Sequence, residues 1–208
     1  MSENYFTYLL LYKLILCYHN TVQYCRSQAA ARISIPENDN MIALSLPDTR
    51  TITAHLFLKE TFDRFCLIEG EITTFNTFHI DGHIHRDFFD TDETAEDTGS
   101  EPPAYSRWSS LREHCLNLIR GKRTPLGFRF VFSLSPENIA RVTGQSGSAV
   151  RPENVQGLYL NFHFDGTSLT CVTGTSFRTF TMDKSLEHIW DEMAQKFFRQ
   201  HQIPFEIK

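Results

Sequence analysis

The five-residue sequence FHIDG at 78–82 returns as FHFDG at 162–166, with only the central apolar residue changed. In each copy an Asp-Gly pair follows alternating apolar residues, which predicts a β-hairpin with a two-residue turn. A second landmark repeats in the same order, because SLPD at 45–48 is similar to SLSPE at 133–137 and both predict a strand that passes into a helix. Asp-Gly turns alone are common, but two matched landmarks predict a chain built from two similar halves.

Apolar periodicity predicts the same order of elements in residues 41–125 and in residues 126–208. Each half is expected to run strand, helix, strand, hairpin strand and helix. This order predicts an α+β fold, an antiparallel sheet with flanking helices, in which residues 41–208 form one compact domain. The expected strands are 41–46, one or two within 64–80, 83–89, 126–134, 158–164, 167–174 and 175–182, and the expected helices are 47–60, 107–122, one from Ser135 and 184–201.

Composition supports a folded chain in a reducing compartment. Hydrophobic residues make up 41% of the 208 residues and include 18 phenylalanines, enough for a substantial core. The five cysteines are odd in number and widely spaced, with no C-x-x-C pair. This favours free buried thiols and a cytoplasmic location, and it excludes a zinc-ribbon or redox motif. The net charge of −5 argues against a protein that coats nucleic acid.

The first forty residues differ from the rest of the chain. Their apolar run at 5–18 is interrupted by Lys13 and is shorter than the roughly 20 apolar residues that span a bilayer. We therefore expect residues 1–40 to be a non-native or disordered N-terminal extension and the fold to begin at Met41. A signal or anchor peptide is the competing interpretation, because QAAAR resembles a small-residue cleavage site, although no basic residue precedes the apolar run.

Three stretches carry a resemblance to a known family: FDRFCLIEGEITTFNTFHIDG, LIRGKRTPLGFRFVFSLSPENIAR and VQGLYLNFHFDGTSLTCVTGTSFRTFTMDKSLEHIWDEMAQKFF. Together they resemble an uncharacterised family of short cytosolic proteins from anaerobic Gram-positive bacteria, known only as a domain of unknown function. The resemblance runs from about Met41 to the C-terminus and leaves out residues 1–40. It implies no activity and no site residues.

The first hairpin contains the strongest candidate for a metal or acid–base site. If Asp81 and Gly82 form the turn, Ile80 faces His83 and Phe78 faces His85 across the ladder. The side chains of His83, His85 and Asp87 would then share the inward face of the sheet, and His79 would lie on the other face. Two imidazoles and a carboxylate are suitable for a metal or for proton transfer. The alternative is a hairpin tip at which these side chains are merely solvated.

A basic segment is the second candidate site. Residues 105–151 hold 8 basic and 2 acidic residues, a net charge of +6, and they follow residues 41–104, which hold 4 basic and 13 acidic residues, a net charge of −9. The cations could bind a nucleic-acid backbone or another anionic partner. Alternatively, they stabilise a helix C-terminus and are neutralised by the acidic loop at 90–101. The candidate anion-binding residues are Arg120, Lys122, Arg123 and Arg129.

No common catalytic motif occurs in the sequence, which has no G-x-x-x-x-G-K-[ST], no G-x-G-x-x-G and no H-E-x-x-H. We therefore expect a small cytosolic binding or accessory protein without catalysis, cofactor or membrane association. Its partner is not identified by the sequence, and another protein is the candidate. One alternative is a metal-dependent or hydrolase-like enzyme that uses His83, His85 and Asp87. The other is a protein that associates with nucleic acid through the basic residues at 107–129.

Overall fold

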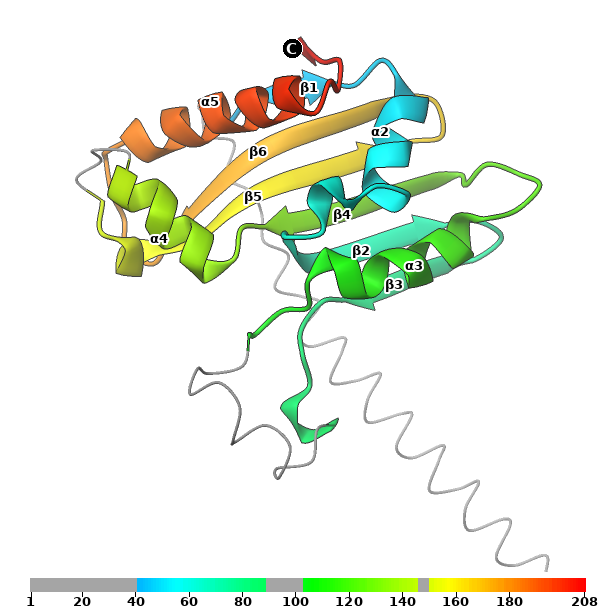
Figure 1. Ribbon diagram of the computed structural model, residues 1–208, viewed down its shortest axis with the longest axis horizontal. Helices are drawn as coiled ribbons and strands as arrows, with labels where there is room; N and C mark the ends of the chain where they lie inside the picture. Colours follow the sequence, from blue (N-terminus) through cyan, green and yellow to red (C-terminus); the bar gives the residue numbers. More distant parts are fainter. Residues whose placement is uncertain (1–40, 89–102, 146–149) are drawn as a thin grey trace, which may run out of the picture. The chain divides into compact units, whose positions relative to one another are not determined.

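Seven strands form one antiparallel sheet in the computed structural model, which describes residues 41–88, 103–145 and 150–208. Across the sheet the order is β3-β2-β4-β5-β6-β1-β7, and every neighbouring pair is antiparallel (Figure 1). The strands are β1 Ala43–Ser45, β2 Cys66–Thr73, β3 Thr77–Asp81, β4 Gly127–Ser133, β5 Val155–Phe164, β6 Leu169–Phe177 and β7 Glu206–Ile207.

Four α-helices in the described part of the chain lie on the same face of this sheet (Figure 1). Two of them begin beside capping side chains: a carboxylate oxygen of Asp48 accepts the N–H of Thr51 at 3.0 Å, and the Ser135 hydroxyl accepts the N–H of Asn138 at 3.4 Å. The expected α+β class is confirmed. The helices are α2 Thr49–Phe57, α3 Trp108–Ile119, α4 Pro136–Gln145 and α5 Ser185–Gln200, with short 3₁₀ turns η1 Glu60–Phe62, η2 Arg86–Phe88 and η3 Pro152–Asn154.

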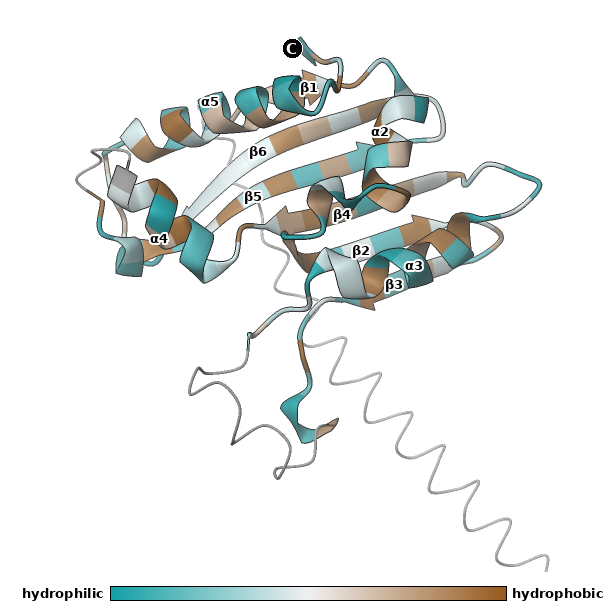
Figure 2. Cartoon of the chain, viewed as in Figure 1, coloured by the Kyte–Doolittle hydropathy of each residue, from teal (hydrophilic) through white to brown (hydrophobic). Residues whose placement is uncertain are grey.

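The hydrophobic core lies between the sheet and these helices. Along β4 the side chains of Phe128, Phe130 and Phe132 are buried, because alternate residues of a strand point to the same face. Phe62 packs against the sheet from above, with its ring 5.3 Å from the ring of Phe162. Apolar residues follow the strands beneath the helices in Figure 2. This aromatic layer fixes where α2 and α3 lie on the sheet.

Trp108, the first residue of α3, joins that helix to the core. Its side chain is fully buried, and its indole N–H donates a hydrogen bond to the Leu56 carbonyl oxygen at 2.6 Å. The ring lies 6.0 Å from that of Phe57, 5.2 Å from that of Phe130 and 5.0 Å from that of Phe132. The start of α3 is therefore held firmly against β4 and α2.

The second hairpin is confirmed, although its loop has four residues, 165–168, rather than two. An oxygen of Asp165 accepts the N–H groups of Thr167 and Ser168 at 2.9 and 2.7 Å, and these bonds hold the pKa of the Asp165 carboxyl well below its usual range. Gly166 has a φ of +93°, a conformation that other residues rarely adopt. Local turn chemistry therefore determines this loop.

The predicted turn at Asp81-Gly82 is wrong. Strands β2 and β3 are joined by residues 74–76, Asp81 ends β3, and the N–H of Gly82 donates to the Ile68 carbonyl at 3.1 Å. A Cβ atom at Gly82 would lie 1.8 Å from the Leu67 carbonyl oxygen. The glycine is therefore required by a close approach of two backbones rather than by a turn.

Strand pairing does not repeat between the halves as the order of elements does. In the second half β4 pairs with β5, whereas in the first half β1 pairs with β6 and β7, and β2 pairs with β3 and β4. The internal duplication is not confirmed and stays a prediction. The strand expected at 175–182 is wrong as a separate element, because β6 continues to Phe177 and residues 178–184 are not in a strand.

Candidate functional site

After β3 the chain leaves the sheet and pairs with the segment that leads into α3. The N–H of Ser106 donates to the Gly82 carbonyl at 2.8 Å, and the N–H of Ile84 donates to the Ala104 carbonyl at 2.9 Å. A further bond, from the N–H of Leu67 to the Ser106 carbonyl at 2.9 Å, fastens this pair to β2. Residues 82–88 and 103–107 are called the neck below.

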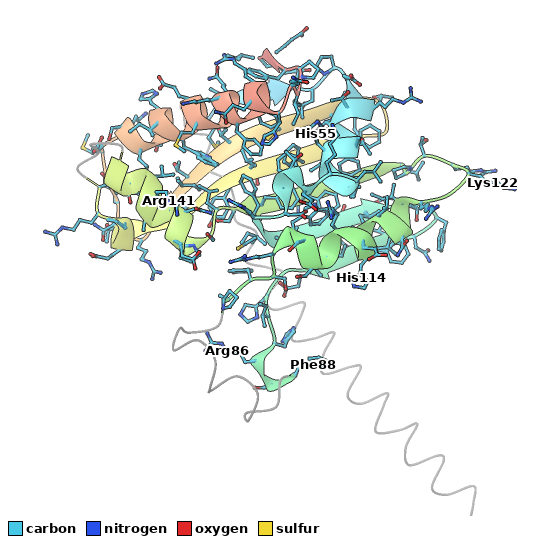
Figure 3. The ribbon with its side chains drawn as sticks, viewed as in Figure 1. His55, Arg86, Phe88, His114, Lys122 and Arg141 are labelled. Carbon is cyan, nitrogen blue, oxygen red and sulfur yellow. The ribbon has the colours of Figure 1, made fainter. Side chains whose placement is uncertain are left out.

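The neck and the first turn of α3 enclose a groove of about 550 Å³. Its apolar wall is formed by Ile84, Phe88 and Pro103. The remaining lining residues carry hydrogen-bonding side chains: His83, His85, Tyr105, Ser106, Arg107 and Ser110. Figure 3 shows Arg86 and Phe88 on the part of the neck that extends away from the sheet. This groove combines polar groups with an apolar wall, as ligand sites commonly do.

Both candidate histidines lie in the groove, but not in the arrangement expected from the sequence. The rings of His83 and His85 are 5.8 Å apart, and His83 is 5.7 Å from the ring of Tyr105. His83 bridges to Tyr105 rather than facing Ile80, so the predicted cross-strand pairing of His83 is wrong. The reason is that Gly82 ends the pairing with β2 and the neck begins there.

The proposed inward position of these side chains is also wrong, since Phe78 faces Ile72 of β2 rather than His85. His83, His85 and Asp87 are all exposed. Within residues 41–88, 103–145 and 150–208, no group of three or more His, Cys, Asp or Glu side chains is placed to hold a metal ion. A metal site at His83, His85 and Asp87 stays a prediction that metal analysis of the purified protein decides.

Arg107 precedes α3 and lines the same groove. The helix has 12 residues, no acidic residue in its first turn and no side-chain cap at Arg107. The N-terminal end of a helix carries a partial positive charge, so the Arg107 guanidinium and the helix both favour an anion at this position. Ser110, in the first turn of α3, also lines the groove.

Cys66 lies directly beneath the neck, where its backbone bridges to Arg107. Burial raises the pKa of the Cys66 thiol, and the charge of Arg107 opposes this shift only in part. Burial also raises the pKa of Cys115 to about 12 and shifts the pKa of Cys171 upward. All three thiols are free and buried, as expected for Cys66, Cys115 and Cys171 in a core. None has the thiolate character of a nucleophile.

The basic residues predicted to bind anions do not form one surface. Arg129 points to the helix-free face of the sheet and donates a hydrogen bond to Glu69 at 2.7 Å. Arg120, Lys122 and Arg123 are exposed in the loop between α3 and β4, and Lys122 lies at its outer end (Figure 3). The acidic loop at 90–101 lies outside the described residues. Anion binding by Arg120, Lys122, Arg123 and Arg129 therefore stays a prediction.

His55, which the sequence did not mark, is the most buried histidine in the described part of the chain. Its Nε2 lies 3.0 Å from the Lys59 ammonium, and its Nδ1 lies 2.7 Å from the Thr61 hydroxyl. Because an ammonium can only donate, Nε2 accepts and Nδ1 carries the ring proton. Burial lowers the pKa of His55, and the charges of Lys59 and His201 lower it further.

This lowered pKa predicts that the fold loses stability as the pH falls. A histidine whose folded pKa lies below its unfolded value binds its proton preferentially in the unfolded chain. The contribution of His55 is therefore complete above about pH 6.5 and declines as the pH falls below that value. We expect the urea-unfolding free energy to decrease over this range, and the decrease to be smaller in His55→Gln. An equal decrease in both proteins would contradict the assignment to His55.

A second buried polar group, Asp191 of α5, was also missed. The Thr173 hydroxyl donates a hydrogen bond to an oxygen of Asp191 at 2.5 Å and lies 3.2 Å from the N–H of Ile42. Burial raises the pKa of the Asp191 carboxyl, and the Thr173 hydrogen bond opposes that shift. These contacts join α5, β6 and the residue before β1, so the role of Asp191 is to fix the first strand.

Comparison with known proteins gives one match. The model of a family of unknown function, DUF5721, matches residues 55–206. No curated protein and no solved structure matches the chain. Among the described residues, no helix is long and apolar enough to cross a membrane.

Proposed function

The chain belongs to DUF5721, a family of unknown function, and we propose from the groove alone that it is a binding protein for a ligand with an anionic group on an apolar body. The anionic group is a phosphate or a carboxylate. The single observation that supports this proposal is that Arg107, His83 and His85 line one groove at the start of α3.

The charged end of the proposed ligand is expected to lie against Arg107. A guanidinium forms two parallel hydrogen bonds with a phosphate or a carboxylate, a geometry that few other side chains offer. The imidazoles of His83 and His85 and the hydroxyls of Tyr105 and Ser110 supply further hydrogen-bond donors. No acidic side chain lines the groove among the described residues, and the exposed Asp87 is the acidic residue of the neck.

The apolar body of the proposed ligand is expected to lie against Ile84, Phe88 and Pro103. Phe88 is 85% exposed. Removing a large aromatic side chain from water is favourable, so a ligand that covers this ring would be stabilised by the hydrophobic effect. An apolar group in the groove would cover this ring and could also contact the Tyr105 ring, which lines the same groove. The free phosphate ion alone is therefore expected to bind more weakly than an aryl phosphate.

The proposal places the protein in the cytoplasm. The three described cysteines are free thiols, as is usual in a reducing compartment. It assigns no chemical step to the groove, because Cys66, the thiol beneath it, has a raised pKa.

Arg107→Ala is expected to weaken the binding of phenyl phosphate by about 10- to 100-fold, because a charge-assisted hydrogen bond contributes about 1.5–3 kcal/mol. Isothermal titration calorimetry of the full chain measures this change. Arg107 is exposed, so the fold is expected to be unaffected. Benzoate in place of phenyl phosphate compares a carboxylate with a phosphate.

Lys122→Ala is the matched control, because it removes an exposed cation from the loop between α3 and β4, outside the groove. Its affinity for phenyl phosphate is expected to equal that of the unaltered protein. Equal losses of affinity for phenyl phosphate in Arg107→Ala and Lys122→Ala would show that binding depends only on the net charge of the protein. The groove would then not be the binding site.

A further inference from the structure

Strand β3 forms one edge of the sheet, and nothing within it blocks a further strand. Among the residues that the structure describes, no strand pairs with its outer edge. Exposed edges in natural sheets are commonly protected by proline, by lysine or by very short length. The strand Thr77–Asp81 has five residues and contains neither proline nor lysine, whereas β7 at the opposite edge has only two residues.

The hydrogen bonds of the β2–β3 ladder show which backbone groups point outward. The N–H of Gly82 donates to the Ile68 carbonyl at 3.1 Å, and the N–H of Thr74 donates to the Asn76 carbonyl at 2.9 Å. With Glu69 opposite Asp81 and Thr73 opposite Thr77, both ends of the ladder are pairs that exchange no hydrogen bonds.

Because bonded and non-bonded pairs alternate in an antiparallel ladder, the residues between these ends can be assigned in turn. Phe78 and Ile80 direct their backbone groups toward β2. The N–H and C=O groups of Thr77, His79 and Asp81 point to the outer edge. The edge therefore offers three residues, spaced two apart, that are ready to form a second ladder.

We propose that β3 pairs with β3 of a second copy of this chain, antiparallel and with the two-fold axis at His79, so that the sheet continues across a homodimer. In this register His79 lies opposite His79 of the second copy, and Thr77 lies opposite Asp81. All outward N–H and C=O groups of these three residues are then satisfied. No register centred elsewhere on β3 pairs all three.

The side chains are also self-complementary in this register. On the helix-covered face Phe78 lies opposite Ile80, and the close spacing of such non-bonded pairs favours apolar contact. On the other face the Thr77 hydroxyl lies opposite the Asp81 carboxylate. The two central imidazoles are each accompanied by a Glu71 carboxylate, which lies 3.3 Å from the His79 ring within one chain.

Sedimentation velocity of the full chain over a wide range of concentration tests the pairing, with a dimer as the expected result. His79→Pro removes an outward N–H from each chain and none of the bonds between β2 and β3. Two hydrogen bonds of the interface are lost, so the dissociation constant is expected to rise by about tenfold or more. Circular dichroism and thermal unfolding establish that the variant folds.

His79→Ala keeps the backbone N–H and is the control, for which the dimer is expected to persist. If proline at residue 79 disturbs the fold, Thr77→Pro is used instead, because it removes another outward N–H. Thr77→Ala, which keeps that N–H, is then the control. A protein that is monomeric at every concentration overturns the proposal, as does a dimer that both proline variants retain. A monomer that captures an extended peptide at this edge would likewise exclude a second copy as its partner.

Discussion

Trp108→Ala is expected to lower the free energy of unfolding by about 3–5 kcal/mol, the usual range for a fully buried aromatic side chain. The indole lies with its ring 5.0–6.0 Å from three phenylalanine rings, so its removal leaves a cavity among them. Its removal also leaves the Leu56 carbonyl without the hydrogen bond at 2.6 Å. Urea unfolding followed by far-ultraviolet circular dichroism measures the loss.

Trp108→Phe separates the two contributions. It retains most of the apolar volume but leaves the buried Leu56 carbonyl unpaired, which costs about 1–3 kcal/mol. We therefore expect Trp108→Phe to be intermediate between the unaltered protein and Trp108→Ala. A loss below about 1 kcal/mol in the alanine variant would mean that α3 is not held on the sheet by this residue.

Gly82→Ala is expected to destabilise the protein by about 3 kcal/mol and to disturb the groove. The new Cβ atom would lie 1.8 Å from the Leu67 carbonyl oxygen and 2.6 Å from the carbon of that group, both parts of the backbone. Neither can move as a side chain can, so the neck must shift away from β2. Thermal unfolding measures the stability.

Gly144→Ala is the matched control for that substitution. Gly144 lies in α4, and a Cβ atom there meets nothing within 4 Å. Alanine in a helix is favoured over glycine by about 0.5–1 kcal/mol, so this variant is expected to be slightly more stable. Similar effects of the two substitutions would contradict the close approach of Gly82 to β2.

Local rules were sufficient for much of the fold. The Asp165-Gly166 hairpin follows from a side chain that binds the two next backbone N–H groups and from a glycine with positive φ. The start of α2 at Asp48 follows from a similar local bond. The apolar pattern predicted a strand at 126–134, and β4 spans Gly127–Ser133. All of these signals lie within a few residues of the feature that they determine.

The errors concern contacts between residues far apart in the sequence. FHIDG and FHFDG have nearly the same letters, but Gly82 is fixed by its approach to Leu67, whereas Gly166 is fixed by its turn. No local signal distinguishes them. The same holds for the groove, in which His83 pairs with Tyr105 and shares the lining with Arg107, two residues far from it in the sequence.

The candidate site was thus predicted in part. His83 and His85 were singled out correctly as neighbours, and their rings are 5.8 Å apart. Their proposed companions were wrong in position, since Ile80 and Phe78 pair with β2. In the sequence Arg107 is one of the basic residues at 107–129. In the structure it lies at the start of α3, whereas Arg120, Lys122 and Arg123 follow the other end of that helix. A charge count along the chain could not reveal that separation.

The most direct test of the proposed binding function is a nuclear magnetic resonance titration of the isotope-labelled full chain with phenyl phosphate. The expected result is a set of saturable shifts in the backbone amides of His83, His85 and Arg107, with little change at Lys122 and Arg123. Arg107→Ala should remove these shifts. Shifts confined to Lys122 and Arg123, or no saturable shift in the neck, would contradict the proposal that this groove binds an anionic ligand.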